Sequence, residues 1–473
     1  MMMKKIMVGT ALAMAVNSAV AVKVQETNIG QVLLGNLYYA NVGLNTDITV
    51  VNNRTDYAVK AKIVFREKAT SSELLDFILY LSPGDVWRGR VVADADGEAR
   101  IVGWDDSQTD NDGEWVSELN PLDFPFYDKN DTGFNNFGHI EVVGAYALSE
   151  GSTTVISKKF GGNIAIKRGM DKADLRDVFD VIEANGSPVY AHQVIANETK
   201  INGDGLYSKI SIGDADTVQL SGNVAFNTPN ENFFNYQLTA LGPTSTREEL
   251  DTLGLTDVTC SYPENCIINN PNFDVTTGEE TILGKNFGRV VSPGAGGGPV
   301  VYSPENIVGI EHALATKFAS WSYEVNSGYH SEYSTNDTVL PIITFPTKYR
   351  HANNAILGDC ALSENPTHFS APFADSAIGE VQYSLISWNN VEQYAVARED
   401  EFSGTTEREL EVLNDEVNLI APDYFANSGW ARINFTDTLN DYTSCGYTGM
   451  PALITVAKMQ GTKWHVEEAN ITR

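Results

Sequence analysis

Asp76-Phe-Ile-Leu-Tyr-Leu-Ser-Pro-Gly-Asp-Val-Trp87 is the stretch that decides the expected fold. Its apolar and polar residues alternate on both sides of Ser82-Pro83-Gly84-Asp85, and a period of two is typical of a strand. Pro and Gly in the middle of these four residues suit the second and third positions of a tight turn. The stretch therefore predicts two strands joined by a turn.

The residues before this stretch have the same period. Apolar residues from 59 to 65 alternate with Lys60, Lys62 and Arg66, which indicates a strand with one face in solvent. We expect the whole of Thr46–Val92 to form an antiparallel ladder in one sheet of an immunoglobulin-like sandwich. Similar runs predict further strands at 32–39, 138–144, 153–157, 189–196, 206–212, 218–226, 339–345, 381–388, 430–435 and 453–458.

Helical periods occur in only a few places. Asp171–Ala184 carries an apolar stripe, and Asp171 is suited to cap the first turn. A short helix is expected after Ser245, and a longer one from Ser303 with a stripe that ends at Trp321. The expected fold class is mainly β, with two immunoglobulin-like antiparallel β-sandwich domains and a few helices.

Length and pattern suggest a division of the chain of 473 residues. An N-terminal β-sandwich domain is expected at 22–170, with an acidic insertion at about 105–136. A helical connection at 171–187 would lead to a β-rich C-terminal domain at 188–473.

The first 21 residues have the pattern of a signal peptide. Lys4 and Lys5 precede a short apolar run, and Ala19-Val20-Ala21 fits the cleavage rule, so we expect cleavage after Ala21. No other apolar segment is long enough to predict a membrane-spanning helix. The sequence therefore predicts a secreted protein, extracellular or on the cell surface.

The charge balance restricts the partners. The chain has 32 basic and 62 acidic residues, a formal net charge of −30. Such a surface repels nucleic acid and anionic membranes and favours cations and solubility.

Four cysteines occur, and an even number in an exported chain favours disulfides. Cys260 and Cys266 enclose a short loop with a proline, so we expect them to pair and to leave Cys360 for Cys445. Two other connectivities stay open. A zinc site is the rival interpretation, but the C-x2-C spacing of such sites is absent.

The acidic turns are the best chemical candidate. Asp94, Asp96, Asp110 and Asp112 lie beside turn-forming glycines, and closely spaced carboxylates can supply the oxygen ligands of calcium. The EF-hand template does not fit, because Leu119 would occupy its last ligand position. We therefore consider a calcium site of another type, and solvated turns as the alternative.

No motif of a catalytic site is present. The stretch 292–301 is similar to the loop around a trypsin-like nucleophile, but Gly297 stands where that chemistry needs serine. The seven histidines lack zinc-protease spacing, and no G-x-S-x-G elbow occurs. A hydrolase would need a site assembled from distant positions.

Aromatic residues crowd the acidic insertion, among them Trp104 and Trp115. On a solvated loop they would stack on sugar rings or anchor a partner. The alternative is that they fix the loop to its own domain.

Several blocks together resemble a known family. They are Thr46–Asn52 with Asp76–Trp87, Thr344-Phe-Pro-Thr-Lys348, Arg398-Glu399-Asp400, and Glu416-Val-Asn418 before Gly429-Trp430. In this order they resemble a family of secreted proteins of Gram-negative, often marine, bacteria, over most of the mature chain. The resemblance implies an exported, mostly β protein of the envelope or exterior, and brings no reaction and no catalytic residues. Arg398-Glu399-Asp400 departs from the family's Arg-Glu-Glu.

These observations lead to one expected function and two alternatives. We expect a secreted, non-enzymatic structural or cell-surface protein that acts through protein–protein contacts, including self-association into a layer or filament. An extracellular module that binds glycans or another ligand is the first alternative. A secreted hydrolase with a dispersed site is the second.

Overall fold

A computed structural model of the protein describes most of two β-rich regions of the chain. The described residues are 22–70, 72–108, 115–128, 133–149, 153–154, 164–176, 193–195, 210–212, 218–229, 232–243, 257–258, 273–274, 281–282, 285–286, 301–302, 311, 313–323, 338–351, 368–374, 376–389, 394–396, 411–420, 429–436, 448–460 and 463–473.

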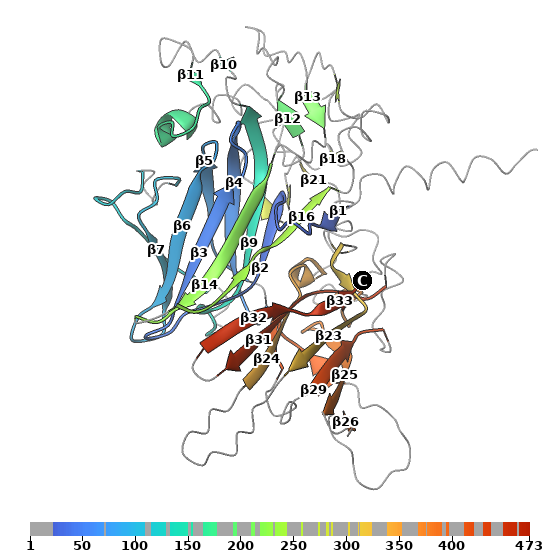
Figure 1. The fold of residues 1–473 in the computed structure, drawn as a ribbon. Helices are drawn as coiled ribbons and strands as arrows, with labels where there is room; N and C mark the ends of the chain where they lie inside the picture. Colours follow the sequence, from blue (N-terminus) through green and yellow to red (C-terminus); the bar gives the residue numbers. More distant parts are fainter. Residues whose placement is uncertain are drawn as a thin grey trace, which may run out of the picture.

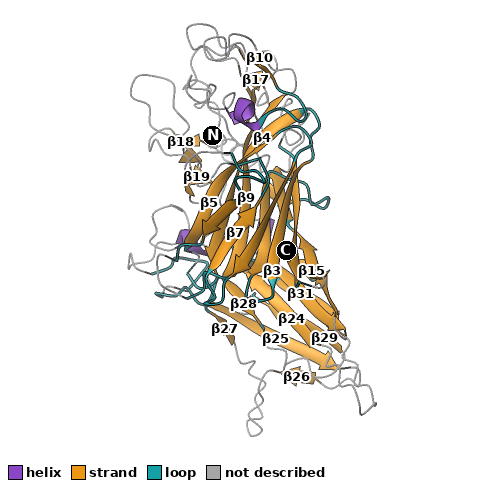
Figure 2. Cartoon of the chain, turned by 90° about the vertical axis from the view of Figure 1, so that its left-hand side faces the viewer, coloured by secondary structure: helices purple, strands orange, loops and turns teal. Residues whose placement is uncertain are grey.

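Strands form nearly all of the regular structure in these residues (Figures 1 and 2). Helix is limited to residues 172–176, 311 and 313–314 and to the 3-10 turn η1 (Lys348–His351). The prediction of a mainly β fold with several antiparallel sheets is confirmed. No helix in the described part of the chain is long and apolar enough to cross a membrane.

The first sheet has nine strands. Its main run of paired strands is β1 (Val22–Val24), β16 (Thr239–Pro243), β2 (Val32–Tyr39), β9 (Phe137–Ser149), β4 (Tyr57–Glu67) and β5 (Glu73–Leu81). Three short strands continue from residues 147–148 of β9: β12 (Gln193–Ile195), β13 (Ile210–Ile212) and β17 (Asp257–Val258).

The second sheet has six strands and shares a core with the first. Its order is β15 (Asn232–Gln237), β14 (Leu220–Asn227), β3 (Asn45–Asn52), β6 (Val86–Ala93), β7 (Ala99–Gly103) and β8 (Leu122–Pro125). Buried side chains of both sheets belong to one apolar cluster, which includes Leu33, Ile63, Phe65 and Ile140 from the first sheet and Ile48, Val50, Trp87 and Val224 from the second. Burial of these apolar faces is the main stabilising contribution.

The strand–turn–strand prediction for Asp76–Trp87 is confirmed, with Gly84 at a φ of 72°. The prediction that Thr46–Val92 forms a ladder in one sheet is wrong, because β4 and β5 belong to the nine-stranded sheet and β3 and β6 to the six-stranded sheet. The turn thus carries the chain from one sheet to the other. Alternation shows which side chains share a face, but it does not show which strand is the neighbour.

The predicted solvent face of β4 is also wrong. Lys60, Lys62 and Arg66 are only 6%, 9% and 2% exposed. Lys62 forms an ion pair with Asp76 on β5, and Lys60 lies over the Tyr80 ring. Burial of both faces is possible because each cation has a partner.

The C-terminal β unit (residues 311–473) contains two larger sheets, drawn in yellow to red in Figure 1. One has β26 (Tyr394–Val396), β25 (Val381–Asn389), β29 (Gly429–Asn434), β23 (Phe318–Tyr323) and β33 (Asn470–Thr472), with β27 (Glu411–Leu413) paired to β25. The other has β28 (Val417–Leu419), β24 (Thr338–Thr344), β31 (Leu453–Gln460) and β32 (Lys463–Glu468). The pair of β22 (Ala315–Thr316) with β30 (Met450–Pro451) also belongs to this unit.

Three further two-stranded pairs lie at 153–302 in the chain. They are β10 (Thr153–Thr154) with β11 (Ile164–Ala165), β18 (Phe273–Asp274) with β21 (Val301–Tyr302), and β19 (Thr281–Ile282) with β20 (Lys285–Asn286).

Strand pairing crosses the connection predicted at 171–187. β14 pairs with β3 along its whole length, and β16 pairs with β2 and β1. Residues 220–243 therefore belong to the two N-terminal sheets, and so does β17 at 257–258. We call these two sheets the N-terminal β unit (residues 22–258).

The predicted helices have different outcomes. Asp171 does cap a helix, since its Oδ1 accepts hydrogen bonds from the amides of Ala173 and Asp174 at 2.9 and 3.2 Å. The rest of that helix beyond residue 176 and the one after Ser245 lie outside the described residues. The helix ending at Trp321 is wrong in its last part, because 318–323 form strand β23. Ala319 and Trp321 alternate as buried residues there, and a short apolar run fits both periods.

Candidate functional site

The two β units meet along a seam made by hydrogen bonds between their backbones and side chains. The amides of Glu416 and Val417 donate to the Lys68 carbonyl at 2.7 and 3.1 Å. Asn36 on β2 donates to the Ile342 carbonyl at 3.1 Å, and its own carbonyl accepts from the Thr344 hydroxyl at 2.7 Å. The strands on the two sides are thus fixed in register with one another.

Buried ionic groups lie at the same seam. Arg66 Nε lies 3.1 Å from Glu141 Oε1, and its guanidinium stacks on the Tyr349 ring with 3.4 Å between the guanidinium carbon and the ring centre. His139 Nε2 lies 3.7 Å from both Glu141 Oε1 and Glu416 Oε1. Arg66, Glu141, His139 and Glu416 are each at most 2% exposed. We call these four residues and Tyr349 the seam cluster.

Electrostatics keep Arg66 charged in the seam cluster. Burial alone would lower the pKa of Arg66, but Glu141, Tyr349 and Glu416 outweigh burial and raise this pKa above its ordinary value. Arginine suits such a buried position because its planar guanidinium can pair with a carboxylate and stack on a ring at the same time. Arg66 does both, with Glu141 and Tyr349, and so links the two units.

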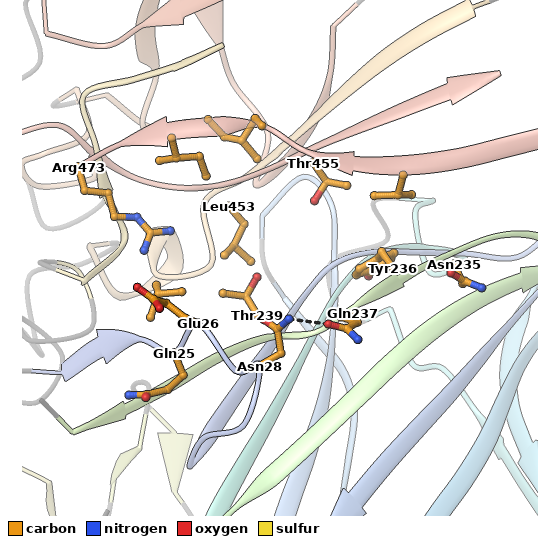
Figure 3. A pocket seen from close by; sticks show the side chains of 15 residues that line it. Gln25, Glu26, Asn28, Asn235, Tyr236, Gln237, Thr239, Leu453, Thr455 and Arg473 are labelled. Carbon is orange, nitrogen blue, oxygen red and sulfur yellow. Dashed lines mark hydrogen bonds between the residues drawn. The ribbon is translucent and has the colours of Figure 1, made fainter. Parts of the chain in front are cut away.

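A polar pocket of about 580 Å³ opens between the N-terminal strands β1, β15 and β16 and the C-terminal strands β31, β32 and β33 (Figure 3). Its N-terminal wall consists mainly of polar side chains: Gln25, Glu26, Asn28, Asn235, Gln237 and Thr239. Its C-terminal wall is mostly aliphatic: Leu453, Ile454, Val466, Ala469 and Ile471, with Thr455 and Arg473. The two walls therefore differ in chemistry.

Local structure explains the polar wall. Along β15, Phe234 and Tyr236 are buried in the core, whereas Asn235 and Gln237 are exposed to the pocket. Asn28 has a φ of 55°, in the left-handed region that asparagine tolerates better than most residues. Its side-chain amide donates to Gln237 Oε1, as the dashed line in Figure 3 shows. Two carboxamides thus hold each other at the pocket wall.

A second pocket, of about 530 Å³, lies at the seam and is apolar. Phe226 and Phe234 stack there with ring centres 4.2 Å apart, and Phe137 packs edge-on against Tyr39. Leu340, Ile342 and Ala457 line it from the C-terminal unit. Apart from Tyr39 and Asn136, the side chains that line this pocket are apolar.

A carboxylate, an imidazole and a hydroxyl meet inside the C-terminal unit. His351 Nε2 lies 2.7 Å from Glu311 Oε1, and its Nδ1 lies 3.3 Å from Ser370 Oγ. Nucleophilic hydrolases use the same three groups. Glu311 and His351 are 0% exposed and Ser370 is 3% exposed, so all three side chains are buried in this conformation.

The predicted calcium ligands are only partly described. Asp94 accepts hydrogen bonds from the amides of Asp96 and Glu98 at 2.9 and 3.0 Å, which closes the turn between β6 and β7. Asp110 and Asp112 lie outside the described residues, within which no three acidic, histidine or cysteine side chains converge on a metal-sized site. The calcium site remains a prediction.

The aromatic residues of the insertion divide into two groups. Trp115 packs edge-on against Tyr80 with 5.9 Å between ring centres, and Phe124 and Phe126 are buried in the core. Trp104 and Tyr127 are 59% and 67% exposed. Most of these rings therefore fix the insertion to its own unit, and Trp104 and Tyr127 are available for contacts.

Other predicted residues lie outside the described part of the chain. They are the signal segment 1–21, Gly297, Arg398-Glu399-Asp400, and the cysteines Cys260, Cys266, Cys360 and Cys445. Sequence reasoning missed the polar pocket, because its amides lie far apart in the chain and have no motif.

Comparison of the chain with protein-family models, curated proteins and solved structures finds no match.

Proposed function

We propose that this chain is an exported structural or cell-surface protein that acts through protein–protein contacts. In this proposal the two β units are immunoglobulin-like sandwich domains that together form one stiff body, released from the signal segment after Ala21. The observation that carries it is the seam, where the two units share hydrogen bonds, buried charges and apolar core.

The shared core makes the stiffness a physical expectation. Ile342, Val417 and Ala457 of the C-terminal unit belong to the same apolar cluster as the N-terminal core. Relative motion of the units would expose these side chains to water and would break the hydrogen bonds of Lys68 and Asn36. A body held in this way can transmit force or present surfaces at fixed spacing.

The insertion supplies the surface that we assign to self-association. Trp104, Leu119 and Tyr127 are 59%, 98% and 67% exposed, on a chain of net charge −30. Exposed tryptophan and tyrosine side chains are typical anchors of protein contacts, and Leu119 adds apolar area beside them. Calcium would reduce the repulsion between two such acidic surfaces.

The test is light scattering and cryo-electron microscopy of the mature, oxidised protein, with millimolar calcium and with chelator. We expect ordered assemblies, and we expect Trp104→Ala with Leu119→Ser to shift them towards monomers. Val42→Ser is the matched control, since Val42 is 71% exposed outside the insertion and should change nothing. A monodisperse monomer at high concentration in both conditions would overturn the self-association.

A further inference from the structure

We propose that the polar pocket between the two β units binds a neutral carbohydrate. In this complex the carboxamides of the N-terminal wall contact the sugar hydroxyls, and the aliphatic C-terminal wall covers the C–H face of the ring. The inference goes beyond the structural function and does not depend on it.

The polar wall matches the hydrogen-bonding pattern of vicinal hydroxyls. Asn28, Asn235 and Gln237 each carry a donor and an acceptor on one planar group. A hydroxyl also donates and accepts, so neighbouring hydroxyls can each exchange hydrogen bonds with one carboxamide. Asn28 and Gln237 already bond each other across the wall, so their side chains are positioned before a ligand arrives.

The opposite wall gives the pocket its second property. Leu453, Val466 and Ile471 come from β31, β32 and β33 and line the pocket on the side of the C-terminal unit. A pyranose ring has a polar rim and a face of C–H groups, so one wall suits each part. A small ion has no apolar face for the aliphatic wall to cover.

Charge and size restrict the ligand further. Glu26 and Arg473 are the residues with charged side chains among those that line the pocket, one of each sign. A phosphorylated ligand would therefore meet a carboxylate beside a single guanidinium on a chain of net charge −30. The volume of about 580 Å³ lies within the range of small-molecule sites, about 300–1,000 Å³. An uncharged mono- or disaccharide fits these limits best.

The test is saturation-transfer NMR of the full mature protein with maltose, cellobiose, laminaribiose and N,N′-diacetylchitobiose at millimolar concentration. We expect transfer to at least one disaccharide, strongest on the protons of one ring face. Gln237→Ala and Asn28→Ala should each weaken binding about tenfold by titration, because each removes a hydrogen-bonding group from the wall.

Asn470→Ala is the matched control. Asn470 is exposed on β33 between Ala469 and Ile471, but it does not line the pocket, so its removal should leave affinity unchanged. Circular dichroism and urea unfolding identify variants that fold normally, and Gln237 is exposed on an edge strand, where substitution is tolerated. Lack of transfer to all four sugars, or binding that survives both pocket substitutions, would overturn the proposal.

Discussion

Lys348 has a buried ammonium group at the end of the seam. The side chain is 2% exposed, and Nζ donates to the Asn414 carbonyl at 2.5 Å. Burial lowers the pKa of Lys348 to about 8, against the opposing effect of Glu416 and two other nearby carboxylates. Lys348 ends the stretch Thr344–Lys348, and its buried position gives that stretch a packing role.

This pKa predicts how stability changes with pH. In the unfolded chain the Lys348 pKa returns to 10.5, so between pH 8 and 10.5 the unfolded chain holds a proton that the folded chain has lost. The free energy of unfolding therefore rises with pH in this window, and Lys348 contributes roughly 3 kcal/mol to the rise. Below pH 8 the titration of Lys348 does not change the free energy of unfolding.

Urea unfolding from pH 7 to 10.5 should show this rise in the unsubstituted protein and its loss in Lys348→Met. The exposed Lys167, replaced by Met, serves as control. A Lys348→Met variant that keeps the natural slope would contradict the assignment.

Strand β9 has three partners in its sheet, because it pairs with β2, β4 and β12. Gly138 lies at its start, and a Cβ atom there would stand 1.7 Å from the carbonyl oxygen of Arg66. Backbone cannot yield as a flexible side chain does, so we expect Gly138→Ala to lower the free energy of unfolding by about 3 kcal/mol or more. Gly242→Ala is the comparison, since its Cβ would meet only the end of the Gln25 side chain at 2.9 Å. Urea unfolding measures both, and equal effects of the two changes would count against the explanation.

The strands are also the scale at which the sequence was most informative. Alternation predicted β2, β24, β25, β29 and β31 to within one or two residues, because the period of side-chain burial is a local property. It could not predict that β5 and β6 belong to different sheets, or that β14 and β16 return to the N-terminal unit, since pairing depends on contacts far apart in the chain. The charged residues of β4 predict that the face with Arg66 lies in solvent. The groups that cover this face, Tyr349 and Glu416, come from the other unit, and a local pattern does not show them.

The candidate site was less predictable for the same reason. The calcium and glycan predictions followed local density of carboxylates and aromatic rings in the insertion. The polar pocket is instead assembled from residues 24–28, 235–239 and 453–473. Asn28, Gln237 and Thr455 are unremarkable polar residues in the sequence, and they acquire a common role only when the units meet. A cavity between two units has no local signal.

At the scale of the whole molecule, the seam determines whether the two units unfold together. The apolar cluster that crosses the seam makes separation of the two units costly. We therefore expect one cooperative transition in urea, with the amides of β4 and β24 exchanging from the same unfolded state.

Arg66→Met should lower the free energy of unfolding of both strands by about 3–5 kcal/mol, because it leaves Glu141 and Glu416 buried without their cation. Arg90→Met should change it by less than about 1 kcal/mol, since the Arg90–Asp47 pair is 43% and 32% exposed. Native-state hydrogen exchange measures both strands in one experiment. If β24 opened at a much lower free energy than β4, or if Arg66→Met affected β4 alone, the units would be independent domains on a hinge, and the stiff body on which the structural function relies would be lost.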